Sequence, residues 1–504
     1  MGDAGARLTA GAVVIAAIIA ATAILAGTAT YGPGTYFDSA VYLSMADGIR
    51  DGSGLVMHDG APAVIWPPGY STVIAAVGWT LGLATETAAR VTNALAVGLT
   101  VVGVGALTYR FTASRVAAVL AAWFVALSAS SLQASMFVMS EPVFAVWYVA
   151  AGACLAGFAH RGRRWWLVAA GLSTAGAVIT RYVGVVFVPV GLLVAVVAAA
   201  GGLRRRLGAA CVYSAAALGP TVPLLARNLA VSGTLTGPRD PAQFGIVESV
   251  EFFAQGLATW LHPGSALRIF ELSWAVPATL AVLITCVVAV TLAWRRRQRP
   301  WEGQTVLVVA LTGMAAALAS FVVVSAVTTK IDPFYQRQLA PLVPGMTIVV
   351  AIGACHLRSV AFSERGRRWL TASMVASAVL LIGLNGTFGL EAVRADRARG
   401  VGGLTLAREL AVPFRAEVAE RLPAGTVYSN GSELIYLDTG RRVPYSPSVD
   451  VLRRRTAEGP VFIIYYDYGR YPRRPPDLMA LTEAFEVDVV AEAVGGRILR
   501  VTER

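Results

Sequence analysis

Two acidic residues follow long apolar runs, at positions where a carboxylate can take part in proton transfer. The first, Asp38, begins a segment in which Phe37, Val41, Met45 and Ile49 recur every four residues. This period predicts a helix with one apolar face that lies along an apolar surface. A carboxylate at such a boundary can act as a general base towards a hydroxyl group. The structural alternative is that Asp38 only caps the helix.

The second acid, Glu141, lies in the sequence Ser140-Glu141-Pro142. It is expected to face the same cavity as Asp38 and to share in the catalysis. The alternative is a helix start, in which Ser140 is the cap and the next two residues form the first turn. The two carboxylates are also compatible with a bound divalent cation, so the sequence leaves the need for a metal open.

Basic residues mark the ends of other apolar runs: Arg181, Arg227, Lys330 and Arg337. Arginine suits phosphate because its planar guanidinium donates two parallel hydrogen bonds. Each residue alone can instead contact lipid headgroups or pair with an acid. Arginine is uncommon on the outer side of membrane proteins. Several on that side together therefore favour an anion-binding site.

The composition indicates which elements position these residues. Of the 504 residues, 56% are hydrophobic and 14% are charged, whereas soluble domains carry roughly 25% charged residues. A membrane span takes about 20 apolar residues. The first run is too long for a signal peptide and is expected to be an uncleaved span. Eleven spans are predicted, at 8–30, 88–109, 116–134, 142–159, 165–180, 183–201, 207–226, 276–294, 305–327, 339–354 and 369–390.

Arginine clusters between the runs predict the orientation. They lie at 110–115, 161–164, 204–206, 295–299 and 365–368, and with eleven spans all fall on the side of the N-terminus. Basic loops stay in the cytoplasm, so the N-terminus is expected inside and the C-terminus outside a plasma membrane. The net charge of +12 then reflects topology and not nucleic-acid binding. The apolar stretch 68–83 would invert this pattern as a span, so it predicts a juxtamembrane or re-entrant helix on the outer face.

Three outer segments are longer than turns: 31–87, 227–275 and 391–504. The last contains β-type runs at 461–466 and 487–490 separated by turn signals, which predicts a small α/β domain. The fold class is therefore mainly α, with a transmembrane domain over 1–390 and an extracytoplasmic α/β domain over 391–504. The four cysteines and four histidines are scattered, without the spacing of a disulfide framework or zinc site.

These motifs resemble the GT-C glycosyltransferases, membrane enzymes that use polyprenyl-phosphate sugars, and especially the lipid A aminoarabinose transferase and protein O-mannosyltransferase branch. The resemblance covers roughly the first 390 residues. Family members often have Asp-Glu at the first-loop acid, but Ser39 follows Asp38 here, so Glu141 is the candidate for the second acid. The matching residues are Asp38 with Tyr42, Trp66-Pro67-Pro68-Gly69-Tyr70, Ser140-Glu141-Pro142, Thr180-Arg181-Tyr182-Val183-Gly184, Arg227-Asn228, and Arg337 with Pro341 and Pro344.

The resemblance implies inverting transfer of a sugar from a polyprenyl-phosphate donor to a hydroxyl of a lipid, glycan or protein acceptor, on the outer side of the membrane. Asp38 would be the general base, and no nucleotide site or certain cofactor is implied. Two other classes stay open: a transporter or flippase, which would favour charges at mid-span and internal repeats, and a scaffold for the outer domain. The implied donor-phosphate ligands are Arg337, Arg227, Arg181 and Lys330, and the implied cavity residues are Tyr42, Trp66, Tyr70 and Tyr182.

Overall fold

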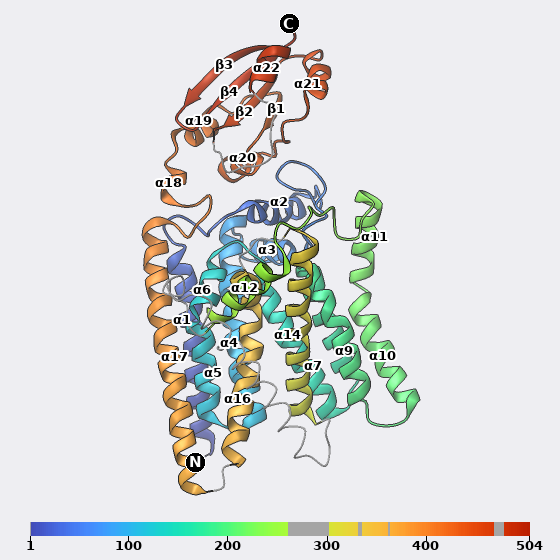
Figure 1. The fold of residues 1–504 in the computed structure, drawn as a ribbon, viewed down its shortest axis with the longest axis vertical. Helices are drawn as coiled ribbons and strands as arrows, with labels where there is room; N and C mark the ends of the chain where they lie inside the picture. Colours follow the sequence, from blue (N-terminus) through green and yellow to red (C-terminus); the bar gives the residue numbers. More distant parts are fainter. Residues whose placement is uncertain (1, 261–301, 331–334, 361–362, 468–477) are drawn as a thin grey trace. The chain divides into compact units, whose positions relative to one another are not determined.

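The computed structural model describes residues 2–260, 302–330, 335–360, 363–467 and 478–504 (Figure 1). The chain divides into two compact units. Unit 1 consists of residues 1–27 and 90–395, and unit 2 of residues 28–89 and 396–504. The first segment expected outside the membrane therefore packs with the C-terminal residues into one unit.

Unit 1 is a bundle of helices in which α7 packs against α8 and α14, α8 against α10, and α1 against α5. Many of the buried residues on these helices are alanines, which let helix backbones approach closely. The elements are α1 (Gly2–Gly27), α4 (Thr85–Thr112), α5 (Arg115–Leu127), α6 (Ala129–Met136), α7 (Glu141–Arg161), α8 (Trp165–Thr180), the 3-10 helix η1 (Tyr182–Val186), α9 (Phe187–Ala198), α10 (Leu203–Leu218), α11 (Thr221–Ser232), α12 (Ile246–Ala258), α14 (Gly303–Thr328), α15 (Tyr335–Leu339), the 3-10 helix η3 (Ala340–Leu342), α16 (Val343–Val360) and α17 (Glu364–Arg399).

Every predicted apolar run within the described residues is helical, but the predicted number of eleven spans is wrong. Six described helices are long and apolar enough to cross a membrane, or up to eight if the bent pairs α5–α6 and α10–α11 each form one span. Helix α8 has only 16 residues, so it covers about 24 Å of a hydrocarbon core roughly 30 Å thick. The chain is thus a multi-pass membrane protein, and its described residues contain fewer straight spans than their hydropathy indicates. The predicted span 276–294 lies outside the described residues.

Two buried asparagine side chains form hydrogen bonds with the backbone around the 45° bend between α5 and α6. Oδ1 of Asn385 accepts the Ala129 N–H at 3.3 Å. Nδ2 of Asn93 donates to the carbonyl oxygens of Ser135 and Phe137, at 3.0 and 2.7 Å. Backbone groups that lose helical partners inside a membrane protein need such substitutes. The chain is therefore held in place immediately before Glu141.

Unit 2 begins with α2 (Phe37–Asp51) and α3 (Gly69–Leu81), which pack against each other. The rings of Tyr42 and Tyr70 meet edge to face at 5.1 Å, and Ser71 Oγ donates to the Tyr42 carbonyl oxygen at 2.8 Å. The 13 residues of α3 are not among the helices able to span a membrane. This result agrees with the prediction that the stretch 68–83 does not cross.

The C-terminal part of unit 2 contains a four-stranded mixed sheet in the order β1-β2-β4-β3. Strands β1 and β2 are parallel, with Thr426 opposite Val461, and the other two pairs are antiparallel. The predicted strand 461–466 is β2 with the same bounds, and 487–490 lies within β3. The elements are α18 (Ala407–Leu410), α19 (Pro413–Arg421), β1 (Thr426–Ser429), α20 (Ser432–Thr439), α21 (Val449–Thr456), β2 (Val461–Tyr466), α22 (Leu478–Ala484), β3 (Glu486–Ala493) and β4 (Gly496–Thr502).

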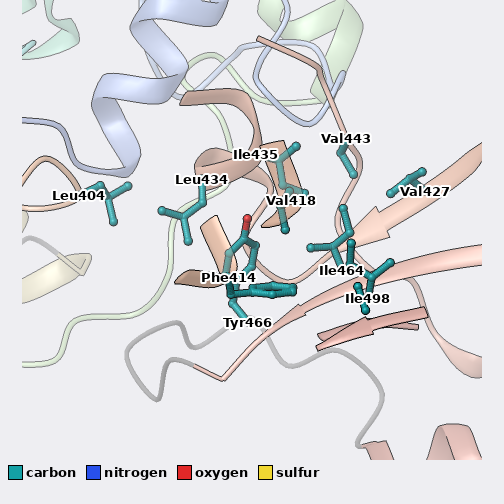
Figure 2. Close-up of a cluster of buried hydrophobic side chains, with 11 residues drawn as sticks. Leu404, Phe414, Val418, Val427, Leu434, Ile435, Val443, Ile464, Tyr466 and Ile498 are labelled. Atoms are coloured by element: carbon teal, nitrogen blue, oxygen red, sulfur yellow. The ribbon is translucent and has the colours of Figure 1, made fainter. Parts of the chain in front are cut away.

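Helices cover both faces of this sheet. One face packs on Phe414 of α19 and Leu434 of α20, and contributes Ile464 and Ile498 (Figure 2). The other face packs on α21 and α22 through a separate cluster that includes Ile463. Neighbouring residues of β2 therefore enter opposite cores, as the two-residue period of a strand requires. A small α/β sandwich results.

A buried histidine joins the two chain segments of unit 2. His58 Nδ1 lies 3.2 Å from Ser432 Oγ, and the His58 carbonyl oxygen accepts the Val443 N–H at 3.2 Å. The imidazole also meets the ring of Phe37 at 5.1 Å. Because these contacts are buried and directional, the segment 28–89 is fixed against the C-terminal fold.

Candidate functional site

Glu141 is the centre of a buried ion cluster in unit 1. It is the first residue of α7, and its side chain is 2% exposed. Oε1 forms ion pairs with Arg181 Nη1 at 2.6 Å and with Arg337 Nε at 3.0 Å. The structure therefore brings together three of the residues that the sequence predicted for the site. A carboxylate is also favoured here because the helix N-terminus carries partial positive charge.

Arg181 reaches Glu141 because the chain leaves the helical conformation at that residue. It ends α8 with φ −150° and ψ 125°, and η1 follows at once. A Cβ at Gly184 would lie 2.6 Å from the Ala177 carbonyl carbon, so only glycine lets η1 pack this closely on α8. Arg181 Nη1 also donates to Ser140 Oγ at 3.2 Å. The local turn thus aims one guanidinium at the start of α7.

Arg337 enters the same cluster from the short helix α15, ahead of α16. Its Nη1 lies 3.5 Å from the sulfur of Met139. Two arginines from distant parts of the chain therefore hold the segment Met139 to Glu141. With two guanidinium groups and one carboxylate, the cluster has a net charge of +1.

The two arginines are more accessible than the acid that they share. Their side chains are 20% and 22% exposed, against 2% for Glu141. A cavity of about 30 Å³ is lined by Glu141, Ser135 and Pro341 among others, a volume sufficient for a water molecule. A ligand that reaches this cluster from solvent would therefore meet the guanidinium groups more readily than the carboxylate.

The other two predicted phosphate ligands lie elsewhere in unit 1. Arg227 Nη1 donates to Asn228 Oδ1 at 3.1 Å, and Asn228 Nδ2 donates to the Tyr182 hydroxyl oxygen at 2.7 Å. Tyr182 is thus connected to Arg227 through Asn228, and it follows Arg181 in the chain. Lys330 is exposed, and its backbone N–H donates to the Asp240 carbonyl oxygen at 2.9 Å.

Asp38 lies in unit 2, in the first turn of α2. The residue at the cap position is Tyr36, whose N–H donates to Ser39 Oγ at 3.0 Å. Asp38 is partly exposed and occupies the second position of the helix. Asp38 is therefore not the N-cap of this helix, which was the structural alternative to a catalytic role.

Three of the four aromatic residues predicted to line a substrate cavity pack within unit 2. Tyr42 and Tyr70 are buried against each other between α2 and α3. Trp66 is half-buried, and its ring lies 5.4 Å from that of Phe37. These contacts orient α2, the helix that carries Asp38.

A second polar cluster was not predicted from the sequence. Asp47 of α2 accepts hydrogen bonds from the Tyr436 and Thr85 hydroxyl groups. Burial and the neighbouring Asp47 carboxylate raise the pKa of Tyr436. The sequence carries no motif that links these residues, because they come from separate segments of unit 2. Within the described residues, no three His, Cys, Asp or Glu side chains are grouped to hold a metal ion.

Comparisons with known proteins find a matching protein family and similar folds. Residues 64–201 match the family model of dolichyl-phosphate-mannose-protein mannosyltransferases. This range includes the Trp66–Tyr70, Glu141 and Arg181 motifs, while Asp38 and Arg337 lie outside it. A sequence comparison with curated proteins finds no match.

The fold is similar to that of ArnT from Cupriavidus metallidurans. The apo structure aligns with a TM-score of 0.65 at 13% identity and covers 97% of this chain and 98% of that chain. The structure of the same protein bound to undecaprenyl phosphate aligns at 0.62, with the same identity and coverage. At this identity the similarity establishes the fold. Together with the family model, it confirms the resemblance to the GT-C glycosyltransferases.

Proposed function

We propose that this protein transfers a sugar from a polyprenyl-phosphate donor to an acceptor hydroxyl on the outer side of the membrane, with inversion at the anomeric carbon. The main support is the match of residues 64–201 to a family of lipid-phosphate-dependent mannosyltransferases. The structural relative ArnT binds undecaprenyl phosphate, which agrees with a lipid-linked donor. In this proposal the N-terminus is cytoplasmic and unit 2 is extracytoplasmic.

The arginine cluster supplies the proposed phosphate site. A leaving polyprenyl phosphate gains negative charge as the glycosidic bond breaks, and fixed cations in a water-poor site stabilise that charge strongly. Arg181 and Arg337 are each about one-fifth exposed. Their guanidinium groups can therefore bind phosphate oxygens while Glu141 holds them in place. Arg227 is a further candidate ligand from α11.

Glu141 is assigned a positioning role in this mechanism. Its side chain is 2% exposed, and Oε1 is already paired with two arginines. A general base must come within hydrogen-bond reach of the proton that it removes. A carboxylate this enclosed cannot reach an acceptor hydroxyl without disrupting the cluster.

Asp38 is the proposed general base. In the reaction, the acceptor oxygen forms a bond to the anomeric carbon while the bond from that carbon to the phosphate oxygen breaks. The proton of the acceptor hydroxyl passes to the Asp38 carboxylate, and the electron pair of the broken bond leaves with the polyprenyl phosphate. Attack from the face opposite the leaving group inverts the anomeric centre.

Replacing Asp38 by asparagine tests this proposal. Asparagine fits the first turn of a helix but cannot take a proton, so turnover should fall by roughly 10²–10⁴, the usual size of a general-base contribution. Stability should change by less than about 1 kcal/mol, the value of a carboxylate near a helix N-terminus. The measurement is transfer of labelled sugar from a panel of polyprenyl-phosphate sugars, with purified protein in detergent and envelope extract as acceptor.

Asp450 provides a matched control. It occupies the second position of α21, as Asp38 does in α2, and it is exposed. Asp450→Asn should transfer sugar at the parent rate. If Asp38→Asn also transfers at that rate, Asp38 is not the base.

Arg337→Ala tests the phosphate site separately. Loss of one charge-assisted contact to the leaving group should cost roughly 2–4 kcal/mol of transition-state stabilisation, by analogy with a lost oxyanion donor. The assay is the same, with protein stability followed in parallel by size-exclusion chromatography. Full activity in Arg337→Ala, Arg181→Ala and Arg227→Ala alike would exclude this site.

A further inference from the structure

Unit 2 contains an open polar cavity that the proposed reaction does not use. Its volume is about 440 Å³, within the roughly 300–1,000 Å³ of small-molecule sites. The walls come from α2, α3 and α20 with the loop that follows it. The residues that carry the argument are Asp47, Arg50, Asp51, Trp79, Tyr436 and Arg442.

Hydrogen bonds fix two polar side chains in the wall of this cavity, Asp47 and Arg50. Asp47 is held by the hydroxyl groups of Tyr436 and Thr85. Arg50 Nη1 donates to the Leu83 carbonyl oxygen at 3.0 Å and to Thr85 Oγ1 at 2.9 Å. Both of these bonds use one nitrogen of the guanidinium. The Asp47 carboxylate and the Arg50 guanidinium are therefore positioned before any ligand arrives, which lowers the entropy cost of binding.

Arg442 and Asp51 form a second charged pair in the wall of the cavity. Arg442 Nη2 lies 3.4 Å from Asp51 Oδ2, and its Nη1 donates to Ser53 Oγ at 3.1 Å. The Nε of Arg442 is buried and has no hydrogen-bond partner among the described residues. A buried donor without a partner is costly, so a ligand oxygen that reached Nε after a shift of the Arg442 side chain would offset that cost.

The balance of charge and one aromatic ring indicate the kind of ligand. Two aspartates and two arginines give the cavity no net charge, which disfavours selection for an anion or a cation. Trp79 is 59% exposed, although large aromatic side chains usually bury their faces. A neutral sugar matches both features, because its C–H face packs on an aromatic ring while adjacent hydroxyls donate to carboxylates and accept from guanidinium groups.

We propose that this cavity binds a neutral sugar residue of a glycan. Under the proposed function this sugar would belong to the acceptor, which favours a glycan acceptor over a protein or a simple lipid. That assignment rests on the proposed function, whereas the binding of the sugar does not. The two can therefore fail independently.

Saturation-transfer difference NMR on the purified full chain in detergent tests the binding without any donor. The probes are the methyl glycosides of mannose, galactose and arabinose, with mannose 6-phosphate as a charged comparison. At least one neutral glycoside should bind. Trp79→Ala should weaken its binding roughly tenfold, as expected for loss of an aromatic contact with its buried area.

Trp369 provides the matched control because it is also highly exposed, at 67%, and belongs to unit 1. Trp369→Ala should leave binding unchanged. If Trp79→Ala disturbs folding, Asp51→Asn is the second variant, because Asp51 is half-exposed and its loss removes one acceptor. It too should weaken the binding.

Three results would overturn the proposal. They are binding of no neutral glycoside, equal weakening by Trp79→Ala and Trp369→Ala, and tighter binding of mannose 6-phosphate than of every neutral probe. Equal weakening would mean that Trp79 is a membrane-interface anchor, as exposed tryptophans often are. Glycoside binding by a chain that transfers no sugar would contradict the proposed function but keep the site.

Discussion

Replacing Glu141 by glutamine tests the arginine cluster directly, because one carboxylate oxygen holds two guanidinium groups. Oε1 lies 2.6 Å from Arg181 Nη1 and 3.0 Å from Arg337 Nε. Glutamine keeps the size of the side chain and one acceptor oxygen but removes the negative charge. Two positive groups then remain close together without compensation.

The expected cost follows from burial. Breaking a buried ion pair by removing one partner costs about 3–5 kcal/mol. The arginines are 20% and 22% exposed, so their hydration offsets part of this free-energy cost. A loss of about 2–3 kcal/mol of stability is therefore expected for Glu141→Gln. Arg337→Ala leaves Glu141 paired with Arg181 and should cost less, roughly 1–2 kcal/mol. In the double variant of Glu141→Gln and Arg337→Ala the two guanidinium groups no longer repel each other. Its loss of stability should therefore be smaller than the sum of the two single losses by about 1 kcal/mol or more.

The assay is the fraction of purified protein that stays monodisperse on size-exclusion chromatography after heating. In a large chain each kcal/mol moves the midpoint by about 2 °C, so Glu141→Gln should lower it by roughly 4–6 °C. Glu364→Gln is the control, because Glu364 also pairs with an arginine in the first turn of a helix but is 75% exposed. Exposed ion pairs contribute little to stability, so the thermal midpoint of Glu364→Gln should equal that of the parent protein.

Two results would refute this reasoning. One is a midpoint for Glu141→Gln equal to that of Glu364→Gln, which would mean that the buried charge is not compensated by the arginines. The other is additivity of the two single substitutions within about 0.5 kcal/mol, the behaviour of independent sites. Either result would remove the positioning role of Glu141.

Two further predictions concern topology and unit 2. A cysteine placed near Asn430 should be labelled by a membrane-impermeant reagent from outside, and one near Arg297 should not, because basic loops stay inside; the reverse pattern would contradict the proposed orientation. Tyr436→Phe should lower the free energy of unfolding by roughly 1.5–3 kcal/mol, the value of a hydrogen bond to a charged group. The thermal midpoints of parent and variant at pH 7 measure this difference. Because the pKa of Tyr436 is raised in the folded state, its contribution is present below about pH 10 and is lost as the pH rises further; equal midpoints of parent and variant at pH 7 would contradict the role of this bond.

Local pattern predicted most of the secondary structure, because apolar composition and period act within one element. The run at 461–466 became β2, and each described apolar run became helical. Hydropathy could not separate straight spans from bent ones. The break between α10 and α11 falls at Gly219 and Pro220, where proline cannot continue the hydrogen-bond ladder. A helix of 16 residues such as α8 has the composition of a span without its length.

The pairing within the site depends on tertiary structure and could not be predicted from one sequence. Arg181, Arg337 and Glu141 were each identified by type and by position at the end of an apolar run. Nothing in those local patterns shows that one carboxylate receives both arginines. The same holds for Asp47 and Tyr436, which meet only because residues 28–89 pack with the C-terminal fold.

The two carboxylates that the sequence treated as partners differ in what their surroundings permit. Glu141 is enclosed, and both arginines use the same oxygen, so its contacts suit it to hold cations in place. Asp38 is partly exposed at the start of α2, while Ser39 makes the capping hydrogen bond to Tyr36. Asp38 is therefore not the cap of this helix. Two acids with such different environments are suited to different roles. In the proposed mechanism the base is therefore Asp38, and Asp38→Asn should lower turnover by roughly 10²–10⁴, whereas Glu141→Gln should mainly weaken folding and the use of donor.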